Sequence, residues 1–368
     1  MKTLPEVDDY RALLLAETPM LDLRAAIEHA SGSLPSAYNL PLLNDDERHQ
    51  VGICYRNNGQ QAAIDLGHQL VIGELREHRL TIWHNYLTRH PQAVLYCARG
   101  GLRSKISQQW LADRGLVYPR VVGGYKALRG YLLGYLSEFC ANGMVLVLSG
   151  MTGTGKTTML RQLARAIDLE GAANHKGSSF GRPLGEQPCQ VDFENRIALD
   201  LLKLSNSADN SKAVVMEDES RMIGSRQVPP ELLARMADSP IAVIDMPFDQ
   251  RLENLWQEYV VERHRQTLEK YGDAGEEHFA SYLKDSLLRI KKRLGGSRTQ
   301  QLLEQMEHAL AHQQGDRFAA HRDWLTTLTQ DYYDPMYRYQ LAQKKQSIVF
   351  RGSASEVAEW LTSTADLT

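Results

Sequence analysis

The sequence predicts an α/β protein made of two successive domains, each with a parallel sheet and flanking helices. Short apolar segments alternate with helical segments through the first half of the chain, as expected when strands and helices alternate. A second alternation starts at Met144, where a continuous apolar segment runs into a glycine-rich loop. The chain of 368 residues is long for one hydrophobic core, so two domains are the natural expectation.

The first domain is expected at residues 8–131 and carries three strand candidates. They are apolar segments next to turns or helical patterns, at residues 19–24, 93–96 and 118–122. Residues 105–114 have helical periodicity, and Gly115 ends the pattern. Because functional loops of parallel α/β sheets follow the carboxyl ends of the strands, the loop after residue 96 is a candidate site.

The second domain is expected at residues 143–368, after a helical connector at residues 132–142. Its strand candidates are the apolar segments at residues 144–148, 213–216, 241–245 and 347–350. A helix is expected at residues 158–166, directly after the glycine-rich loop. The charged segment at about residues 250–330 has a helical pattern, and we interpret it as a helical insertion or lid.

The composition narrows the class of protein. The formal net charge of −3 excludes a uniformly basic, nucleic-acid-coating surface. The four cysteines form no CxxC pair, which argues against a structural metal site or a disulfide framework and favours a reducing compartment. The N-terminal residues lack an apolar signal region, and no apolar run reaches membrane length. We therefore expect a cytoplasmic protein with no membrane partner and no prosthetic group.

The glycine-rich loop has the complete phosphate-binding pattern G-x4-G-K-[ST], with an apolar strand before it and a helical pattern after it. Its glycines allow backbone N–H groups to converge on phosphate oxygens, while Lys156 adds a charge and the Thr157 hydroxyl can ligate Mg²⁺. The pattern predicts a site for a di- or triphosphate and does not identify the rest of the ligand. The predicted diphosphate-binding residues are Gly150, Gly153, Thr154, Gly155, Lys156, Thr157 and Thr158.

Three acidic residues, Glu217, Asp218 and Glu219, follow the strand candidate at residues 213–216. In P-loop proteins a carboxylate at the end of a neighbouring strand holds the metal ion. One of these carboxylates is therefore predicted to orient Mg²⁺ or water. The alternative is a solvated acidic turn.

A second candidate anion site is the cysteine loop, residues 97–104, which begins with Cys97 after the strand candidate at residues 93–96. Two arginines and the start of the next helix would stabilise a thiolate, and two glycines permit a tight backbone around the sulfur. We predict that Cys97 is a nucleophile that accepts a sulfur-like atom or a phosphoryl group. The alternative is a buried cysteine before an ordinary turn. The predicted anion-binding residues are Arg99, Gly100, Gly101, Arg103 and Ser104.

Further segments of the first domain match a known pattern. They are residues 21–24, Glu28, Gly32, Pro35, Ala37, Asn39, Pro41 and residues 121–124. With Cys97 they make residues 8–131 resemble the rhodanese family, which implies a rhodanese-like parallel sheet followed by a P-loop NTPase-like α/β domain. The C-x5-R spacing from Cys97 to Arg103 resembles the phosphatase branch of that fold, in which the loop is one residue longer than in the sulfurtransferases. Tyr96 stands where those phosphatases commonly have histidine, and the sequence shows no general-acid partner.

Other matches extend over nearly the whole chain. They lie at residues 45–48, 51–52, 97–104, 123–129, 150–157, 177–181, 217–224 and 332–339. Together they resemble the family of bacterial tRNA 2-selenouridine synthases. The resemblance implies a transferase that converts wobble 2-thiouridine to 2-selenouridine, by S-geranylation with geranyl diphosphate and then selenation with selenophosphate. It also implies the lysine, glutamate and glutamine tRNAs as partners, with a selenophosphate-producing enzyme as a further candidate partner.

An RNA substrate requires an electropositive surface with aromatic side chains. The candidate RNA-contact residues are Arg293, Arg298, Tyr333, Tyr337 and Arg338. For the tyrosines, packing against the last strand and helix is the alternative. The residues leave two other functions open. One is a rhodanese-type phosphatase or sulfurtransferase fused to a P-loop kinase-like domain, and the other is a nucleotide-binding switch with a redox-sensing cysteine.

Overall fold

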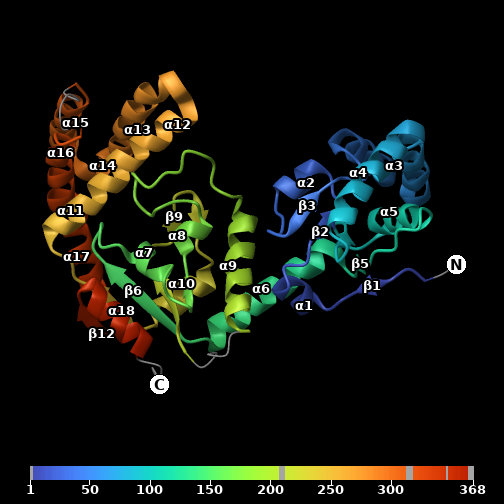
Figure 1. The fold of residues 1–368 in the computed structure, drawn as a ribbon, viewed down its shortest axis with the longest axis horizontal. Helices are drawn as coiled ribbons and strands as arrows, with labels where there is room; N and C mark the ends of the chain where they lie inside the picture. Colours follow the sequence, from blue (N-terminus) through green and yellow to red (C-terminus); the bar gives the residue numbers. More distant parts are fainter. Residues whose placement is uncertain (1–2, 207–211, 312–317, 345–346, 364–368) are drawn as a thin grey trace. The chain divides into compact units, whose positions relative to one another are not determined.

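The chain divides into two compact units in the computed structural model (Figure 1). The structure describes residues 3–206, 212–311, 318–344 and 347–363. The first unit comprises Met1–Ser137 with Cys189–Asn206, and the second comprises Glu138–Pro188 with Ser207–Thr368. Each unit has its own parallel sheet, which confirms the predicted α/β class. The helix α9 (Gln190–Leu204) groups with the first unit, although the chain before and after it belongs to the second.

The first unit contains a five-stranded sheet in the order β1-β5-β4-β2-β3, in which every neighbouring pair is parallel. All side chains of β4 are buried, as expected for a central strand with helices on both faces. The loops after β2, β4 and β5 therefore meet at one edge of the sheet. The strands are β1 (Glu6–Val7), β2 (Met20–Asp22), β3 (Ala37–Asn39), β4 (Val94–Tyr96) and β5 (Arg120–Val121).

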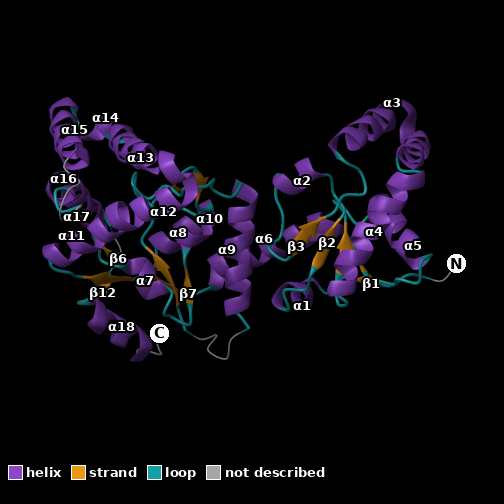
Figure 2. Cartoon of the chain, turned by 45° about the horizontal axis from the view of Figure 1, so that its top comes forward, coloured by secondary structure: helices purple, strands orange, loops and turns teal. Residues whose placement is uncertain are grey.

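Helices flank these strands (Figure 2), and the core packs Trp83 and Trp110 with Leu95 of β4. The longest helix, α3, begins at a capping box on Asn44 and bends at Gly59, where φ is 85°. The helices are α1 (Tyr10–Leu15), α2 (Ala26–Ala30), α3 (Asp45–Leu70), α4 (Gly73–Arg89) and α5 (Leu102–Ala112), and α6 (Gly124–Asn142) continues into the second unit.

The second unit contains a parallel five-stranded sheet in the order β12-β11-β6-β8-β7. All residues of the central strand β6 are buried. The loops after β6, β7 and β8 share one edge of this sheet, because the strands run in the same direction. The strands are β6 (Val145–Gly150), β7 (Ala166–Ile167), β8 (Val214–Glu217), β11 (Ile241–Ile244) and β12 (Ile348–Gly352), and β9 (Met222–Ile223) pairs antiparallel with β10 (Arg226–Gln227).

Between β11 and β12 the described chain is mostly helical (Figure 1), and its buried apolar side chains form a second core in this unit. Phe180 stacks on Trp324 there, with ring centres 5.4 Å apart, and Phe279 is fully buried beside them. Its helical segments are α11 (Phe248–Trp256), η1 (Gln257–Glu262), α12 (Arg263–Tyr271), η2 (Gly272–Ala274), α13 (Gly275–Arg289), α14 (Lys291–Leu294), α15 (Gly296–Ala311), α16 (His321–Leu328), η3 (Thr329–Tyr333) and α17 (Asp334–Gln343). The other helices are α7 (Lys156–Leu160), α8 (Leu169–Ala172), α10 (Pro230–Ala237) and α18 (Ala354–Ser363).

Each predicted strand is present, within two residues of its predicted bounds. The helix predicted at residues 158–166 is wrong at its end, because α7 stops at Leu160. Ala166 and Ile167 instead form β7, whose backbone pairs with the edge of β8. This sheet pairing outweighs the local helical pattern. Among the described helices, none is long and apolar enough to cross a membrane.

Candidate functional site

The cysteine loop follows β4 and leads into α5. Cys97 is 3% exposed, and its Sγ lies 3.2 Å from the hydroxyl oxygen of Ser104 in the first turn of α5. The same hydroxyl lies 3.1 Å from the Gly101 carbonyl oxygen. It can therefore donate to the carbonyl when Cys97 is a thiol and to the sulfur when Cys97 is a thiolate. The structure thus brings two predicted residues, Gly101 and Ser104, next to the Cys97 sulfur.

A glycine turn after β5 holds the main chain of the cysteine loop. The N–H of Tyr125 donates to the carbonyl oxygen of Cys97 at 2.9 Å. Gly124 has a φ of +59°, and a Cβ atom there would lie 2.2 Å from the same carbonyl oxygen. Only glycine fits this close approach, which gives a physical reason for the Gly123-Gly124 pair.

The two arginines of the cysteine loop have different surroundings. Arg103 forms a two-point ion pair with Glu28 of α2, at N–O distances of 2.5 and 3.0 Å. Burial lowers the pKa of Arg103, but the contact with Glu28 outweighs burial and the net pKa is raised. Arg99 is exposed. Arg103 therefore remains charged near Cys97, while the Arg99 side chain faces solvent.

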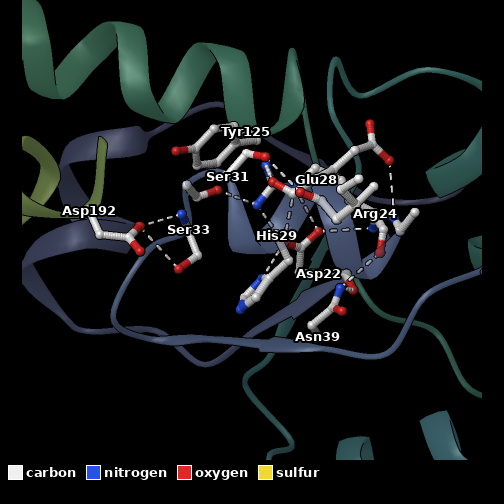
Figure 3. A network of polar contacts seen from close by, with 12 residues as sticks. Asp22, Arg24, Glu28, His29, Ser31, Ser33, Asn39, Tyr125 and Asp192 are labelled. Atoms are coloured by element: carbon white, nitrogen blue, oxygen red, sulfur yellow. Dashed lines mark hydrogen bonds and ion pairs between the residues drawn. The ribbon is translucent and has the colours of Figure 1, made fainter. Parts of the chain in front are cut away.

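A network of polar contacts surrounds Asp22 at the end of β2, the strand next to β4 (Figure 3). Asp22 is fully buried and lies opposite Tyr96, the last residue of β4. Arg24 donates to both Asp22 carboxylate oxygens at 2.7 and 3.0 Å, and its guanidinium lies 3.9 Å from the centre of the Tyr125 ring. His29 Nδ1 lies 2.9 Å from the same carboxylate. Burial raises the pKa of Asp22, but the hydrogen bonds from His29 and Arg24 lower it by more, so the net pKa is below the usual value. The carboxylate therefore stays ionised and ties β2 to its neighbours.

The P-loop, residues 150–157, follows β6 and turns at two glycines with positive φ. Gly153 has a φ of +88°, and a Cβ atom there would lie 2.6 Å from a carbonyl oxygen of α11. Gly155 has a φ of +78° and directly precedes α7. The ammonium of Lys156 donates to the carbonyl oxygen of Gly150 at 2.7 Å, which keeps the charge within the loop. Backbone N–H groups and a lysine in this arrangement can bind a diphosphate.

Glu170, a residue that the sequence did not indicate, connects the P-loop to the predicted acidic residues. Its carboxylate accepts from the Thr157 hydroxyl at 3.0 Å, and its N–H donates to Glu217 Oε1 at 2.6 Å. Glu217 ends β8 and is 1% exposed, and its Oε2 has no hydrogen-bond partner among the described residues. Burial and the charge of Glu170 raise the pKa of Glu219. The Thr157 hydroxyl is the group of this cluster that can ligate a Mg²⁺ ion bound with phosphate.

Asp218, the remaining member of the acidic cluster, is turned away from Glu217 because neighbouring strand residues face opposite sides. The Ser149 hydroxyl donates to its carboxylate, and Lys344 forms an ion pair with it. No group of three His, Cys, Asp or Glu side chains arranged to hold a metal ion is found in the described part of the chain. A Mg²⁺ ion would therefore be held mainly by phosphate oxygens, Thr157 and water, as is usual for this ion.

The carboxylate of Glu217 gives a pH-dependent contribution to stability. Burial raises its pKa from the ordinary value of 4.5 to about 8. Between these values the folded state binds more protons than the unfolded state, so the free energy of unfolding falls as pH rises. We expect Glu217→Gln to flatten this fall by up to about 1.4 kcal/mol per pH unit, measured by urea unfolding between about pH 5 and pH 8. Glu359→Gln, on an exposed position of α18, is the control, and equal slopes for both variants would contradict the assignment.

The five candidate RNA-contact residues lie in the helical part of the second unit. Arg293 and Arg298 are exposed, and Arg338 is 67% exposed. Tyr337 is half-buried, with its hydroxyl 3.2 Å from the Ser149 hydroxyl. Tyr333 is only 5% exposed and packs in the helical core, so stacking on a base would require this ring to leave that core.

Comparison with known proteins gives similarity along the whole chain. Residues 143–367 match the family described as tRNA 2-selenouridine synthase AAA domain. A protein of Marinobacter nauticus named tRNA 2-selenouridine synthase is 46% identical over 365 residues, which are 99% of either chain. A protein of the same name from Serratia proteamaculans is 48% identical over 96% of this chain and 95% of its own length. A solved structure, the N-terminal domain of a proposed ATP/GTP binding protein from Clostridium difficile 630, is 29% identical with a TM-score of 0.31 and covers 35% of this chain and 98% of its own.

Proposed function

The chain belongs to the tRNA 2-selenouridine synthase family, and from this premise we propose that it replaces sulfur by selenium at the wobble 2-thiouridine of tRNA. The observation that carries the proposal is the similarity along almost the full chain, which includes both the cysteine loop and the P-loop. A rhodanese-like first domain and a P-loop second domain would each supply one of two steps. The proposed co-substrates are geranyl diphosphate and selenophosphate.

In the proposed first step, the thiouridine sulfur attacks C1 of geranyl diphosphate. A C–S bond forms, the C–O bond to the diphosphate breaks, and the base loses its N3 proton. The leaving diphosphate gains negative charge, and the P-loop N–H groups and the Lys156 ammonium would stabilise it. A bound Mg²⁺ would supply further charge neutralisation, and the Thr157 hydroxyl would hold it together with the phosphate oxygens.

In the proposed second step, selenium displaces the geranylated sulfur at C2 of the base. The Cys97 thiolate would attack the phosphorus of selenophosphate, so that an S–P bond forms and hydrogen selenide leaves. The selenide then attacks C2, the C–S bond breaks, and geranyl thiol leaves with a proton. Water hydrolyses the phosphocysteine to inorganic phosphate. This sequence is redox-neutral, and the C-x5-R spacing of the cysteine loop fits a tetrahedral phosphoryl group.

The proposed macromolecular partner is a tRNA with 2-thiouridine at the wobble position, as in the lysine, glutamate and glutamine acceptors. Arg293, Arg298 and Arg338 offer exposed positive charge for its phosphates, and Tyr337 offers a partly accessible ring. A selenophosphate-producing enzyme would supply the second step.

Nucleoside analysis of bulk tRNA tests the function. In cells that lack this protein and grow with selenite, 2-selenouridine should disappear and 2-thiouridine should accumulate at the same position. Expression of the wild-type chain should restore the selenonucleoside. Unchanged 2-selenouridine in the deletion strain would refute the proposal. Nucleotide turnover by the purified chain without RNA would instead favour the alternative of a phosphatase or sulfurtransferase fused to a kinase-like domain.

A further inference from the structure

An apolar cavity of about 260 Å³ lies in the first unit between α3 and α5. Leu102 and Arg103, which directly follow the glycines of the cysteine loop, form part of its wall. The cavity is therefore continuous with the loop that carries Cys97. Neither the P-loop nor the polar network at Asp22 contributes to it.

The wall of this cavity is suited to a hydrocarbon. Val51, Ala63 and Ile64 come from α3, and Ile106 and Trp110 come from α5. The wall also includes Leu102, which is 42% exposed, and Tyr55, which is 57% exposed. Exposed apolar side chains around an apolar hollow are unfavourable in water and are covered when an apolar ligand binds. The polar residues of the wall are Gln60, His68 and Arg103, and Glu28 pairs with Arg103.

Gly67 of α3 contributes to the open space of the cavity. It lines the cavity in the second half of a 26-residue helix, where glycine is less favourable than alanine. No positive φ requires glycine at this position, and a Cβ atom would come no closer than 3.9 Å to its nearest neighbour, a methyl group of Val51. Because Gly67 has no side chain, this part of the cavity stays open.

The volume indicates the size of a chain that the cavity could hold. A cavity of roughly 150 Å³ accepts benzene, which has six carbons. On the same scale, a cavity of about 260 Å³ accepts a chain of about ten carbons. The anion-binding loop at one end would receive the polar group to which such a chain is attached.

We propose that this cavity binds the geranyl chain, with the reacting end of the substrate at the cysteine loop. The inference rests on the proposed function, which supplies a geranylated nucleoside as the substrate for selenium transfer. Burial of the chain would use its binding energy to place C2 of the base at the site where selenide is released. Geranyl diphosphate and the S-geranyl nucleoside carry the same chain, so the test has one arm for each.

The first arm measures selenium transfer to anticodon stem-loop RNAs that carry S-methyl-, S-geranyl- or S-farnesyl-2-thiouridine. One buried methylene contributes about a fourfold change in affinity, so the wild type should prefer the geranyl RNA to the methyl RNA by at least about 100-fold in kcat/KM. The fifteen-carbon farnesyl chain exceeds the cavity, and its rate should fall below that of geranyl. These comparisons use the wild-type chain and do not depend on the folding of a variant.

Ala63→Phe fills the cavity, because Ala63 lies in its wall and is 5% exposed. We expect this variant to lose the preference for geranyl and to keep the rate with the methyl RNA. Gln69→Phe adds the same ring at an exposed position of α3 and should leave both rates unchanged. Val51→Ala enlarges the cavity and should raise the relative rate with the farnesyl RNA. In the second arm, a loss of geranyl transfer from geranyl diphosphate by Ala63→Phe would assign the chain of the donor to the same cavity.

The outcomes separate the inference from the function. No selenium transfer by the wild type to any of these RNAs would refute the proposed function, and the inference with it. Selenium transfer that is independent of chain length would refute the cavity assignment alone. So would an Ala63→Phe variant that keeps the geranyl preference of the first arm and the rate of geranyl transfer of the second arm.

Discussion

Replacing Cys97 by serine should lower selenium transfer to tRNA by at least about 1,000-fold, because the loss of a catalytic nucleophile commonly has an effect of this size. Geranyl transfer should stay unchanged. The serine hydroxyl fits the space of the thiol but is a far weaker nucleophile near neutral pH. Bulk tRNA treated with this variant, geranyl diphosphate and selenophosphate should accumulate S-geranyl-2-thiouridine. The measurement is quantitative nucleoside analysis by mass spectrometry.

Cys140→Ser is the matched control for this experiment. Burial raises the pKa of the Cys140 thiol to about 12, so it remains protonated and should not act as a nucleophile. Its substitution should leave both steps unchanged. Selenium transfer by Cys97→Ser at the wild-type rate would contradict the role of Cys97 as the nucleophile.

Isotopic labelling of selenophosphate identifies the group that Cys97 accepts. Labelled phosphorus on the protein during turnover would support attack on phosphorus, whereas labelled selenium would indicate a selenosulfide. Neither label on Cys97 in an active enzyme would indicate that the loop binds the donor without covalent chemistry. The Ser104 hydroxyl, 3.2 Å from the sulfur, would then stabilise a Cys97 thiolate that contributes its negative charge and does not act as a nucleophile.

The sheets could be predicted from the sequence because their strands are buried on both faces. The segments that became β4 and β6 are continuous apolar runs, and each leads into a loop whose residue types have a chemical meaning. Cys97 and Lys156 were therefore identified together with the elements that position them. The pairing of Arg103 with Glu28 could not be predicted, since it joins residues 75 positions apart.

Two parts of the site depend on tertiary structure that local patterns do not contain. Glu170 was missed because the pattern across residues 158–166 predicts a helix, whereas β7 forms by pairing with β8. Its carboxylate reaches Thr157 only as a result of that pairing. The apolar cavity was also missed, since α3 is mostly polar in composition and the wall of the cavity combines residues of α3 and α5.

Replacing Lys156 by alanine should lower geranyl transfer by at least about 100-fold, because removing one group that stabilises developing charge typically has this effect. The Lys156 ammonium lies 2.7 Å from the Gly150 carbonyl oxygen, inside the loop where the diphosphate would bind. Loss of its charge should destabilise the departing diphosphate more than the bound donor, so kcat should fall more than KM rises. The measurement is transfer of labelled geranyl groups to 2-thiouridine tRNA.

Lys284→Ala is the matched control, since Lys284 is a surface residue of the same unit and pairs with Glu307. It should leave geranyl transfer unchanged, because an exposed ion pair of this kind has little effect on the rest of the protein. With tRNA that is already geranylated, Lys156→Ala should transfer selenium at the wild-type rate, since no diphosphate leaves in that step. Full geranyl transfer by Lys156→Ala would contradict the assignment of the diphosphate to the P-loop. The cysteine loop would then be the remaining anion site for the donor, next to the cavity that fits its chain.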